Sequence, residues 1–133
     1  AQIASPQAWP ASQDLESWEL LPTKPDWAGG FRETWRVGEA AAQARLEHWA
    51  ELVEDYGDTR NLPGEDGSSR LSPHLHWGEL SPATVWHRLA GQGVGRQIYA
   101  KELIWRDYGA SVIAQFPDYA REPYKPGFEA MHR

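Results

Sequence analysis

Apolar side chains recur at helical spacing in three stretches of the chain. From Gly38 to about residue 56 the apolar positions stand three and four residues apart, with glutamates on the opposite face; they are Leu46, Trp49, Leu52, Val53 and Tyr56. A second helix is expected from residue 81 to about residue 90, with Val85, Trp86 and Leu89 facing inward. A third is expected at residues 95–115, which contain no proline and would span about 30 Å at ~1.5 Å per residue.

The first 30 residues have a different pattern. Prolines at positions 6, 10, 22 and 25 exclude a long helix, and tryptophans at positions 9, 18 and 27 are expected to anchor the segment on a neighbouring surface. One short helix is predicted from about Ser12 to Leu21, capped by Ser12. Few residues are β-branched and none alternate, so the fold class is predicted as all-α, with residues 1–30 as a linker and residues 31–133 as a helical domain.

Two helix starts follow one another in the middle of the chain. Ser72 and Ser81 each precede a proline, which pairs a hydroxyl N-cap with a favoured first helical residue, and Gly78 is expected to end the first helix. Residues 67–71 add a flexible turn, two hydroxyls and a guanidinium beside a helix N-terminus, a combination that suits a phosphate. Such loops also occur where no phosphate binds, so both interpretations stay open on the residues alone.

The helix expected at residues 95–115 carries aromatic and charged side chains on one face, at Tyr99, Glu102, Trp105 and Arg106. Glu102 and Arg106 are spaced as an i,i+4 ion pair. One interpretation is a surface ion pair beside a half-buried tryptophan. The other is a cavity wall, in which an indole stacks on a base, a carboxyl bonds a base edge and a guanidinium meets a phosphate.

The net charge of −6 argues against a uniformly basic surface for nucleic acid, but the charge is unevenly distributed. Residues 1–59 carry a net charge of −7, residues 60–106 carry +2 and residues 107–133 carry −1. The positive part coincides with the helix starts and the long helix. A local DNA-binding face within an acidic chain is therefore compatible with the composition.

Cysteine is absent, which excludes disulfides and thiolate metal sites and is compatible with a cytoplasmic location. No apolar run approaches the ~18 residues of a membrane span, so a soluble chain without a membrane partner is expected. His74 and His76 are two residues apart and face different sides of a helix, with no further ligand at a suitable spacing. Capping or packing roles are predicted for them, and no metal site.

Four segments of the chain carry distinctive motifs. Residues 69–82 read SRLSPHLHWGELSP, and residues 102–108 read ELIWRDY. Upstream, residues 35–40 read WRVGEA, and RNLP follows Tyr56. Together they resemble the flavin-binding domain of the DNA photolyase/cryptochrome family, in which the position of Val37 is usually proline. The segments keep the order and spacing of the family over about residues 15–133, and their pattern is similar to class I cyclobutane pyrimidine dimer photolyases.

The resemblance implies what the chain is part of. The fold would be the amino-terminal part of the helical FAD-binding domain, after a Pro/Trp-rich linker. The full-length protein would be a deoxyribodipyrimidine photolyase, a carbon–carbon lyase that uses light and FAD to split pyrimidine dimers flipped out of damaged DNA. A photolyase is several times longer, so a fragment that is inactive alone is expected, with the antenna chromophore held only in an α/β domain that this sequence lacks.

The resemblance also implies roles for single residues. FAD contacts are carried over to Tyr56, Ser68, Ser69, Arg70, Leu71, Ser72, Tyr99 and Arg106. Ser68 stands where Thr is commoner in the family, and Tyr99 where Trp or Phe is. Glu102 would hydrogen-bond the pyrimidine dimer and Trp105 would stack on it. No catalytic residue or metal ligand is assigned within this chain.

Two alternatives stay open beside the photolyase interpretation. A cryptochrome-type blue-light photoreceptor would use the same flavin pocket without repair activity, although Glu102 together with Trp105 favours a dimer-binding cavity. The chain could also be a folding unit with no activity of its own, because half of the cavity is not encoded. A truncated helical domain would expose an apolar patch that favours self-association, and whether the fragment binds FAD is left open.

Overall fold

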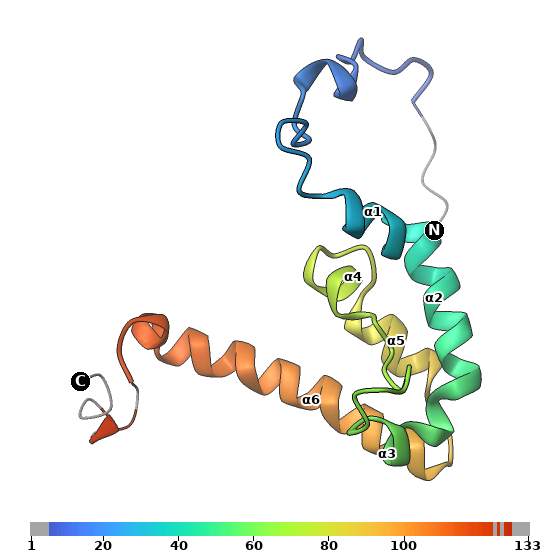
Figure 1. Ribbon diagram of the computed structural model, residues 1–133, viewed down its shortest axis with the longest axis vertical. Coiled ribbons are helices and arrows are strands. Elements are labelled where there is room, and N and C mark those ends of the chain that lie inside the picture. Colours follow the sequence, from blue (N-terminus) through green and yellow to red (C-terminus); the bar gives the residue numbers. More distant parts are fainter. Residues whose placement is uncertain (1–5, 124, 126, 129–133) are drawn as a thin grey trace. The chain divides into compact units, whose positions relative to one another are not determined.

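The computed structural model describes residues 6–123, 125, 127 and 128 (Figure 1). Its elements in chain order are η1 (Leu15–Trp18), α1 (Gly29–Thr34), α2 (Glu39–Leu52), η2 (Val53–Asp55), α3 (Tyr56–Thr59), α4 (Ser72–His76), α5 (Pro82–Arg88), α6 (Val94–Gln115) and η3 (Pro117–Ala120), where η marks a 3₁₀ helix. No strand occurs among the described residues, and the all-α prediction is confirmed. The first five residues of the predicted linker lie outside the described part.

The chain divides into two compact units, Ala1–Arg36 and Val37–Arg133. In the first unit, the helix predicted from residue 12 to residue 21 is reduced to the single turn η1. Asp14, and not Ser12, caps this turn by accepting the N–H of Glu16, and Glu19 ends it in the left-handed region at φ 49°. The limit predicted between linker and domain, after residue 30, stays a prediction.

The core of the second unit is built around α2. Leu46, Trp49 and Val53 are buried as predicted, whereas Leu52 is 39% exposed. At about 100° per residue, Leu52 lies roughly 120° around the helix from Leu46 and so misses the buried stripe. The other buried apolar side chains of this core are Ala42, Ala50, Leu71, Leu75, Leu80, Val85, Leu89, Tyr99 and Leu103.

The two helix starts predicted from Ser-Pro pairs have different outcomes. Ser81 caps α5 as expected, since its Oγ accepts the N–H of Ala83 at 3.2 Å. Ser72 is not a cap but the first residue of α4, and Leu71 precedes it at the N-cap position without a side-chain hydrogen bond. Burial of Leu71 sets where α4 begins, and this tertiary contact outweighs the capping preference. Gly78 follows α4 with φ 75°, as expected for a residue that ends a helix.

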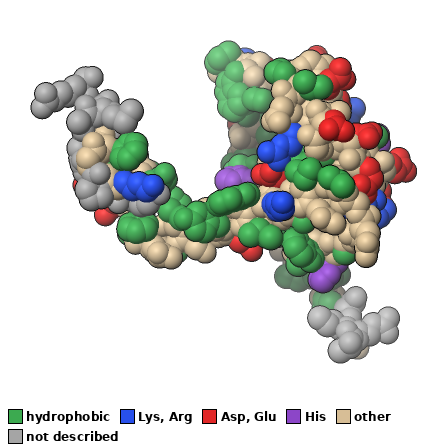
Figure 2. All heavy atoms as spheres, turned by 90° about the horizontal axis from the view of Figure 1, so that it is seen from below, with side chains coloured by type: hydrophobic (Ala, Val, Ile, Leu, Met, Phe, Trp, Pro, Cys, Tyr) green, Lys and Arg blue, Asp and Glu red, His purple; other side chains and the backbone are tan. Residues whose placement is uncertain are grey.

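The long helix α6 confirms the element predicted at residues 95–115. Its first half packs against η2, α3 and α5. Farther along, it exposes a series of large apolar side chains, Ile104, Trp105, Tyr108 and Ile113, and Phe116 directly after the helix is exposed as well. Figure 2 shows hydrophobic side chains following this helix on the face in view. Within the described ranges, no helix combines the length and the apolar character needed to cross a bilayer.

Candidate functional site

An aromatic cluster joins α2, α3 and α6. Trp49, Tyr56 and Tyr99 place their ring centroids 5.2 to 5.6 Å apart in tilted or edge-to-face contacts. Trp49 and Tyr99 are buried and Tyr56 is half-buried. Burial is the main cause that raises the pKa of both phenols, so both hydroxyls stay protonated at neutral pH and can donate hydrogen bonds.

The loop before α4 is held from two sides. From α6, the Tyr99 hydroxyl donates to Ser69 Oγ at 2.9 Å, and the same oxygen accepts the N–H of Leu71 at 3.2 Å. From α2, the Arg45 guanidinium donates from Nε to the Ser69 carbonyl at 2.7 Å and from Nη2 to the Ser68 carbonyl at 3.1 Å. Ser69 is therefore fixed through both its side chain and its backbone.

The next residues give this loop its curvature. Arg70 lies in the left-handed region at φ 53°, and Leu71 follows in the right-handed helical region at φ −88° and ψ −9°. Consecutive residues of opposite hand form a concave array of backbone N–H groups that can take an anion. The Arg70 side chain pairs with Asp66, with Nε 3.0 Å from Oδ1, and Ser72 is exposed in the first turn of α4. Of the predicted FAD contacts in the loop, the structure joins Ser69 to Tyr99 and directs the Arg70 guanidinium to Asp66.

Glu102 pairs with Arg60 and not with Arg106. Arg60 Nη1 lies 2.5 Å from Glu102 Oε1, and the Arg60 guanidinium also lies over the Tyr56 ring, 5.6 Å from its centroid. Arg106 Nη2 donates instead to the Leu75 carbonyl at 3.3 Å. The i,i+4 ion pair predicted from the sequence is therefore wrong, because neighbours outside α6 offer partners to both groups.

Trp105 lies on an exposed part of α6. Its side chain is 63% exposed, more than the sequence pattern suggested, and its ring meets that of Tyr108 edge to face with centroids 5.5 Å apart. The four residues predicted to share one face of α6 thus differ in environment: Tyr99 is buried, Glu102 is bridged to α3 through Arg60, and Trp105 faces outward. An indole in this setting has an open face for stacking.

The chain matches several known proteins. It is 37% identical over 137 residues to a deoxyribodipyrimidine photo-lyase of Agrobacterium fabrum, a match that covers 97% of this chain and 28% of the relative. A deoxyribodipyrimidine photo-lyase of Streptomyces griseus is 37% identical over 93 residues, covering 68% of this chain and 20% of the relative. No family model matches the chain.

A solved structure is also similar. It is the crystal structure of a bacterial class III photolyase from Agrobacterium tumefaciens, with a TM-score of 0.86 and 35% sequence identity over 96% of this chain. The chain belongs to the DNA photolyase/cryptochrome family. It spans only 28% of that solved photolyase and 20 to 28% of the two curated relatives.

The photolyase class of the chain stays a prediction. The sequence motifs resemble class I photolyases, while the solved neighbour is a class III photolyase. The Agrobacterium fabrum relative is matched over 97% of this chain, which includes the Pro/Trp-rich first unit, and the Streptomyces griseus relative over 68%.

Two residues that help to build this candidate site are not marked by the sequence motifs. Arg45 appears in the sequence only as one polar position of α2, and Trp49 only as one of its apolar positions. The partners of Arg45 lie 23 and 24 residues away along the chain, and Trp49 meets Tyr56 and Tyr99 from two other helices. Helical spacing reports only contacts within one helix, so no local signal could have identified either role.

A second polar network links α4 to the start of α2. His74 is buried, and its Nδ1 lies 2.6 Å from Glu79 Oε2. The other oxygen of the carboxylate, Oε1, accepts the N–H of Gly38 at 2.7 Å, at the N-cap position of α2. Glu79 therefore serves a helix start that has no side-chain cap of its own. Among the residues that the structure describes, no group of three His, Asp or Glu side chains forms a metal site.

Acid is expected to destabilise the chain through Glu79. The hydrogen bond with His74, followed by that from the Gly38 N–H, holds the pKa of Glu79 below its usual value of 4.5. A carboxyl whose pKa is lower in the folded state contributes stability that is complete above about pH 4.5 and is lost as the pH falls through the folded-state pKa. Thermal unfolding between pH 3 and 6 should show this loss in the wild type and a smaller loss in Glu79→Gln. Equal acid sensitivity of the two proteins would contradict it.

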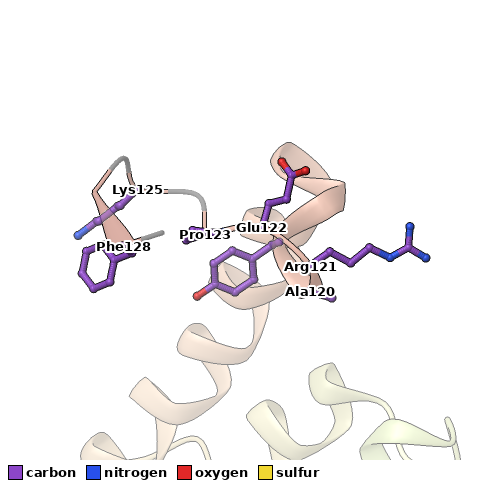
Figure 3. A pocket seen from close by; sticks show the side chains of 7 residues that line it. Ala120, Arg121, Glu122, Pro123, Lys125 and Phe128 are labelled. Atoms are coloured by element: carbon purple, nitrogen blue, oxygen red, sulfur yellow. The ribbon is translucent and has the colours of Figure 1, made fainter. Parts of the chain in front are cut away.

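One hollow in the described part of this photolyase-family chain lies away from the candidate residues. A cavity of about 430 Å³ is lined by Tyr119, Ala120, Arg121, Glu122, Pro123, Lys125 and Phe128 (Figure 3). A smaller groove of about 260 Å³ between α5 and α6 includes Tyr99, together with Trp86 and Leu103. The candidate residues therefore form a wall on α3, the loop and α6, and not the lining of the larger cavity.

Proposed function

We propose that the chain is a segment of a deoxyribodipyrimidine photolyase, a lyase that uses light to split cyclobutane pyrimidine dimers in DNA. The observation that carries the proposal is the match over 97% of the chain to a relative of that name. The arrangement of the aromatic cluster, the loop at residues 68–71 and the first half of α6 is consistent with it. The activity belongs to the full-length protein, of which this chain supplies one wall of the site.

FAD is the cofactor we propose for the full-length protein. When bound it would supply a light-excitable electron donor. Three features of this chain fit a flavin nucleotide. The concave backbone around Arg70 leaves the N–H groups of Ser69 and Arg70 without an acceptor among the described residues, which suits a diphosphate. The neutral Tyr56 phenol can donate a hydrogen bond, and Trp49 Nε1 is buried without a hydrogen-bond partner. Every described buried side-chain polar atom other than this indole nitrogen has a partner. The rest of the site would come from sequence outside this chain.

Single roles follow from this placement. The backbone of the loop would orient the diphosphate, with Ser68 and Ser72 at its two ends. Tyr56 and Tyr99 would shield one side of the site from water. Arg106 is held by the Leu75 carbonyl and would support the wall between cofactor and DNA.

Damaged DNA is the partner we propose. Glu102 Oε1 is engaged by Arg60, while Oε2 has no partner among the described residues and can accept a hydrogen bond from a base edge. Trp105 offers an exposed indole face on which an unstacked pyrimidine dimer can lie. The two side chains stand three residues apart on α6, which allows both to meet one extruded dinucleotide.

A repair assay tests the function. The full-length protein, supplied with FAD and a chemical reductant, should convert an oligonucleotide carrying one thymine dimer to intact DNA under blue light and not in the dark. Bound FAD with no repair in the light would contradict the photolyase proposal and favour the cryptochrome-type alternative.

We also propose four properties that do not depend on the candidate site: inactivity of the chain alone, its self-association, the place of the antenna chromophore and the cellular location. The 133-residue chain alone would be inactive, and the exposed apolar side chains of α6 would drive its self-association, which sedimentation velocity measures. The antenna chromophore would bind in the α/β part of the full-length protein. A cytoplasmic location is proposed from the absence of cysteine and from the need to reach DNA.

A further inference from the structure

We propose that Arg45 is the positioning residue for the loop at residues 68–71, and through that loop for the diphosphate of the flavin. This inference rests on the proposed function and deepens it. Arg45 lies on α2, outside every motif of the family resemblance, and its guanidinium is half-buried against the loop.

Arg45 sets the direction of two peptide units, those that begin with the carbonyls of Ser68 and Ser69. Arg45 binds the carbonyls of Ser68 and Ser69, which therefore both point toward α2. In a trans peptide the N–H points opposite to the C=O of the same unit, and these units are trans. The N–H groups of Ser69 and Arg70 must then face away from α2. Neither has an acceptor among the described residues.

The backbone of Arg70 has an unfavourable conformation that needs support from outside the loop. A φ of 53° is uncommon for a residue other than glycine, because Cβ crowds the backbone there. Rotating the peptide unit between Ser69 and Arg70 by about 180° would return φ to the extended region that such residues prefer. The same rotation would replace the outward N–H by a carbonyl oxygen, which repels an anion. The observed arrangement therefore needs an external hold on the Ser69 carbonyl.

Arg45 supplies that hold. The Tyr99 hydroxyl and the Leu71 N–H both bind Ser69 Oγ, so they fix the side chain and leave the peptide units free to rotate. No other hydrogen bond within the described ranges reaches the carbonyls of Ser68 and Ser69. Two donors on one planar guanidinium take both carbonyls at once, which a compact lysine ammonium on a flexible four-carbon stem does less well.

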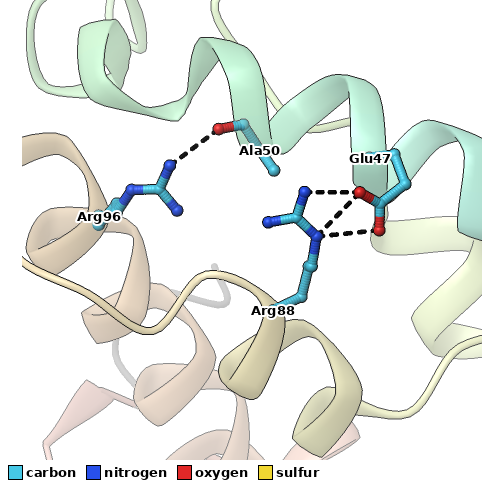
Figure 4. A network of polar contacts seen from close by, with 4 residues as sticks. All are labelled: Glu47, Ala50, Arg88 and Arg96. Carbon is cyan, nitrogen blue, oxygen red and sulfur yellow. Dashed lines mark hydrogen bonds and ion pairs between the residues drawn. The ribbon is translucent and has the colours of Figure 1, made fainter.

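Two other arginines that bind residues of α2 provide matched controls (Figure 4). Arg88 on α5 binds the carboxylate of Glu47 on α2, with Nη2 2.5 Å from Oε2. Arg96 on α6 donates from Nη2 to the Ala50 carbonyl of α2 at 3.0 Å. Both tie another helix to α2 as Arg45 ties the loop, but neither contacts residues 68–71.

The experiment compares Arg45→Ala, Arg45→Lys and Arg88→Ala in the full-length protein. The dissociation constant of FAD is measured by flavin fluorescence on the apoprotein, and the apoprotein Tm is measured in parallel. Arg45→Ala should raise the dissociation constant about tenfold or more, the effect of one charge-assisted hydrogen bond, while its Tm falls no further than that of Arg88→Ala. Arg45→Lys should be intermediate, and millimolar guanidinium should restore FAD affinity to Arg45→Ala alone.

Four results would overturn the inference. One is a wild type that binds FAD and an Arg45→Ala variant whose FAD dissociation constant lies within twofold of it. That result would contradict the role of Arg45 and leave the proposed function intact. Another is an FAD dissociation constant that rises as much in Arg88→Ala as in Arg45→Ala. A third is a rise in the dissociation constant of Arg45→Ala that guanidinium does not reverse and that comes with a large fall in Tm. Either result would indicate a general structural role for Arg45. Absence of FAD binding by the wild type would overturn the proposed function together with this inference.

Discussion

Replacing Trp105 by alanine in the full-length protein is expected to weaken binding of dimer-containing DNA by roughly 5- to 150-fold. The reason is loss of the stacking surface, since one base stacked on an aromatic side chain contributes ~1–3 kcal/mol. The free energy of unfolding should change little, because the indole is 63% exposed and its described ring contact is an edge-to-face meeting with Tyr108. Titration of a fluorescent dimer-containing oligonucleotide measures the affinity. At saturating protein, the repair yield per absorbed photon should change less than the affinity does.

Trp77 provides the control for this substitution. It carries the same side chain, is 77% exposed and lies at the C-terminal end of α4, where its described ring contact is with His76. Trp77→Ala should bind dimer-containing DNA like the wild type. Wild-type affinity and repair in Trp105→Ala would remove the proposed lesion contact from α6, and equal losses in both variants would indicate a nonspecific effect.

Gly95→Ala is expected to lower the free energy of unfolding by at least ~2 kcal/mol, although glycine to alanine inside a helix is ordinarily stabilising. Gly95 is buried in the first turn of α6, where that helix meets η2. A Cβ on this residue would lie 2.1 Å from the Val53 carbonyl oxygen and 2.5 Å from Glu54 Cα. Both obstacles are backbone, so α6 would have to move away from η2, and with it Tyr99 from the loop. Urea unfolding followed by circular dichroism measures the loss.

The same helix contains a second glycine that isolates this effect. A Cβ on Gly109 would meet nothing within 4 Å, and its φ is not in the left-handed region. Gly109→Ala should therefore raise the free energy of unfolding by about 0.5–1 kcal/mol, through helix propensity alone. A Gly95→Ala protein as stable as Gly109→Ala would contradict the close approach of α6 and η2.

The helices could be predicted from the sequence where their limits depend on residues close together in the chain, such as helix breakers and caps. The long helix α6 is found within one residue of its predicted limits, because no proline or glycine pair interrupts it after Gly93. Ser81 caps α5 for a local reason as well. The failures have tertiary causes: burial of Leu71 shifts the start of α4 ahead of the Ser72 cap, and the helix predicted in the first unit shrinks to η1, none of whose residues is buried.

The sequence predicted which residues belong to the candidate site better than it predicted which of them contact one another. The resemblance placed Tyr99, Ser69 and Glu102 in one site, and the structure links Tyr99 to Ser69 and Glu102 to Arg60. The partner of Glu102 was expected four residues away and is found 42 residues away. Charge spacing along a helix predicts a pair only when no better partner arrives from another element, and Arg60 is such a partner. The roles proposed for these residues stay predictions.

We propose that the loop at residues 68–71 and the first half of α6 form one wall of a flavin site. The most direct test is an absorption spectrum of the full-length protein after addition of FAD and removal of free flavin by filtration, in the wild type and in Tyr99→Ala. We expect the wild type to retain flavin at close to one molecule per chain and Tyr99→Ala, which lacks the hydroxyl that binds Ser69, to retain much less. Full retention by Tyr99→Ala, or no retained flavin in the wild type, would contradict it.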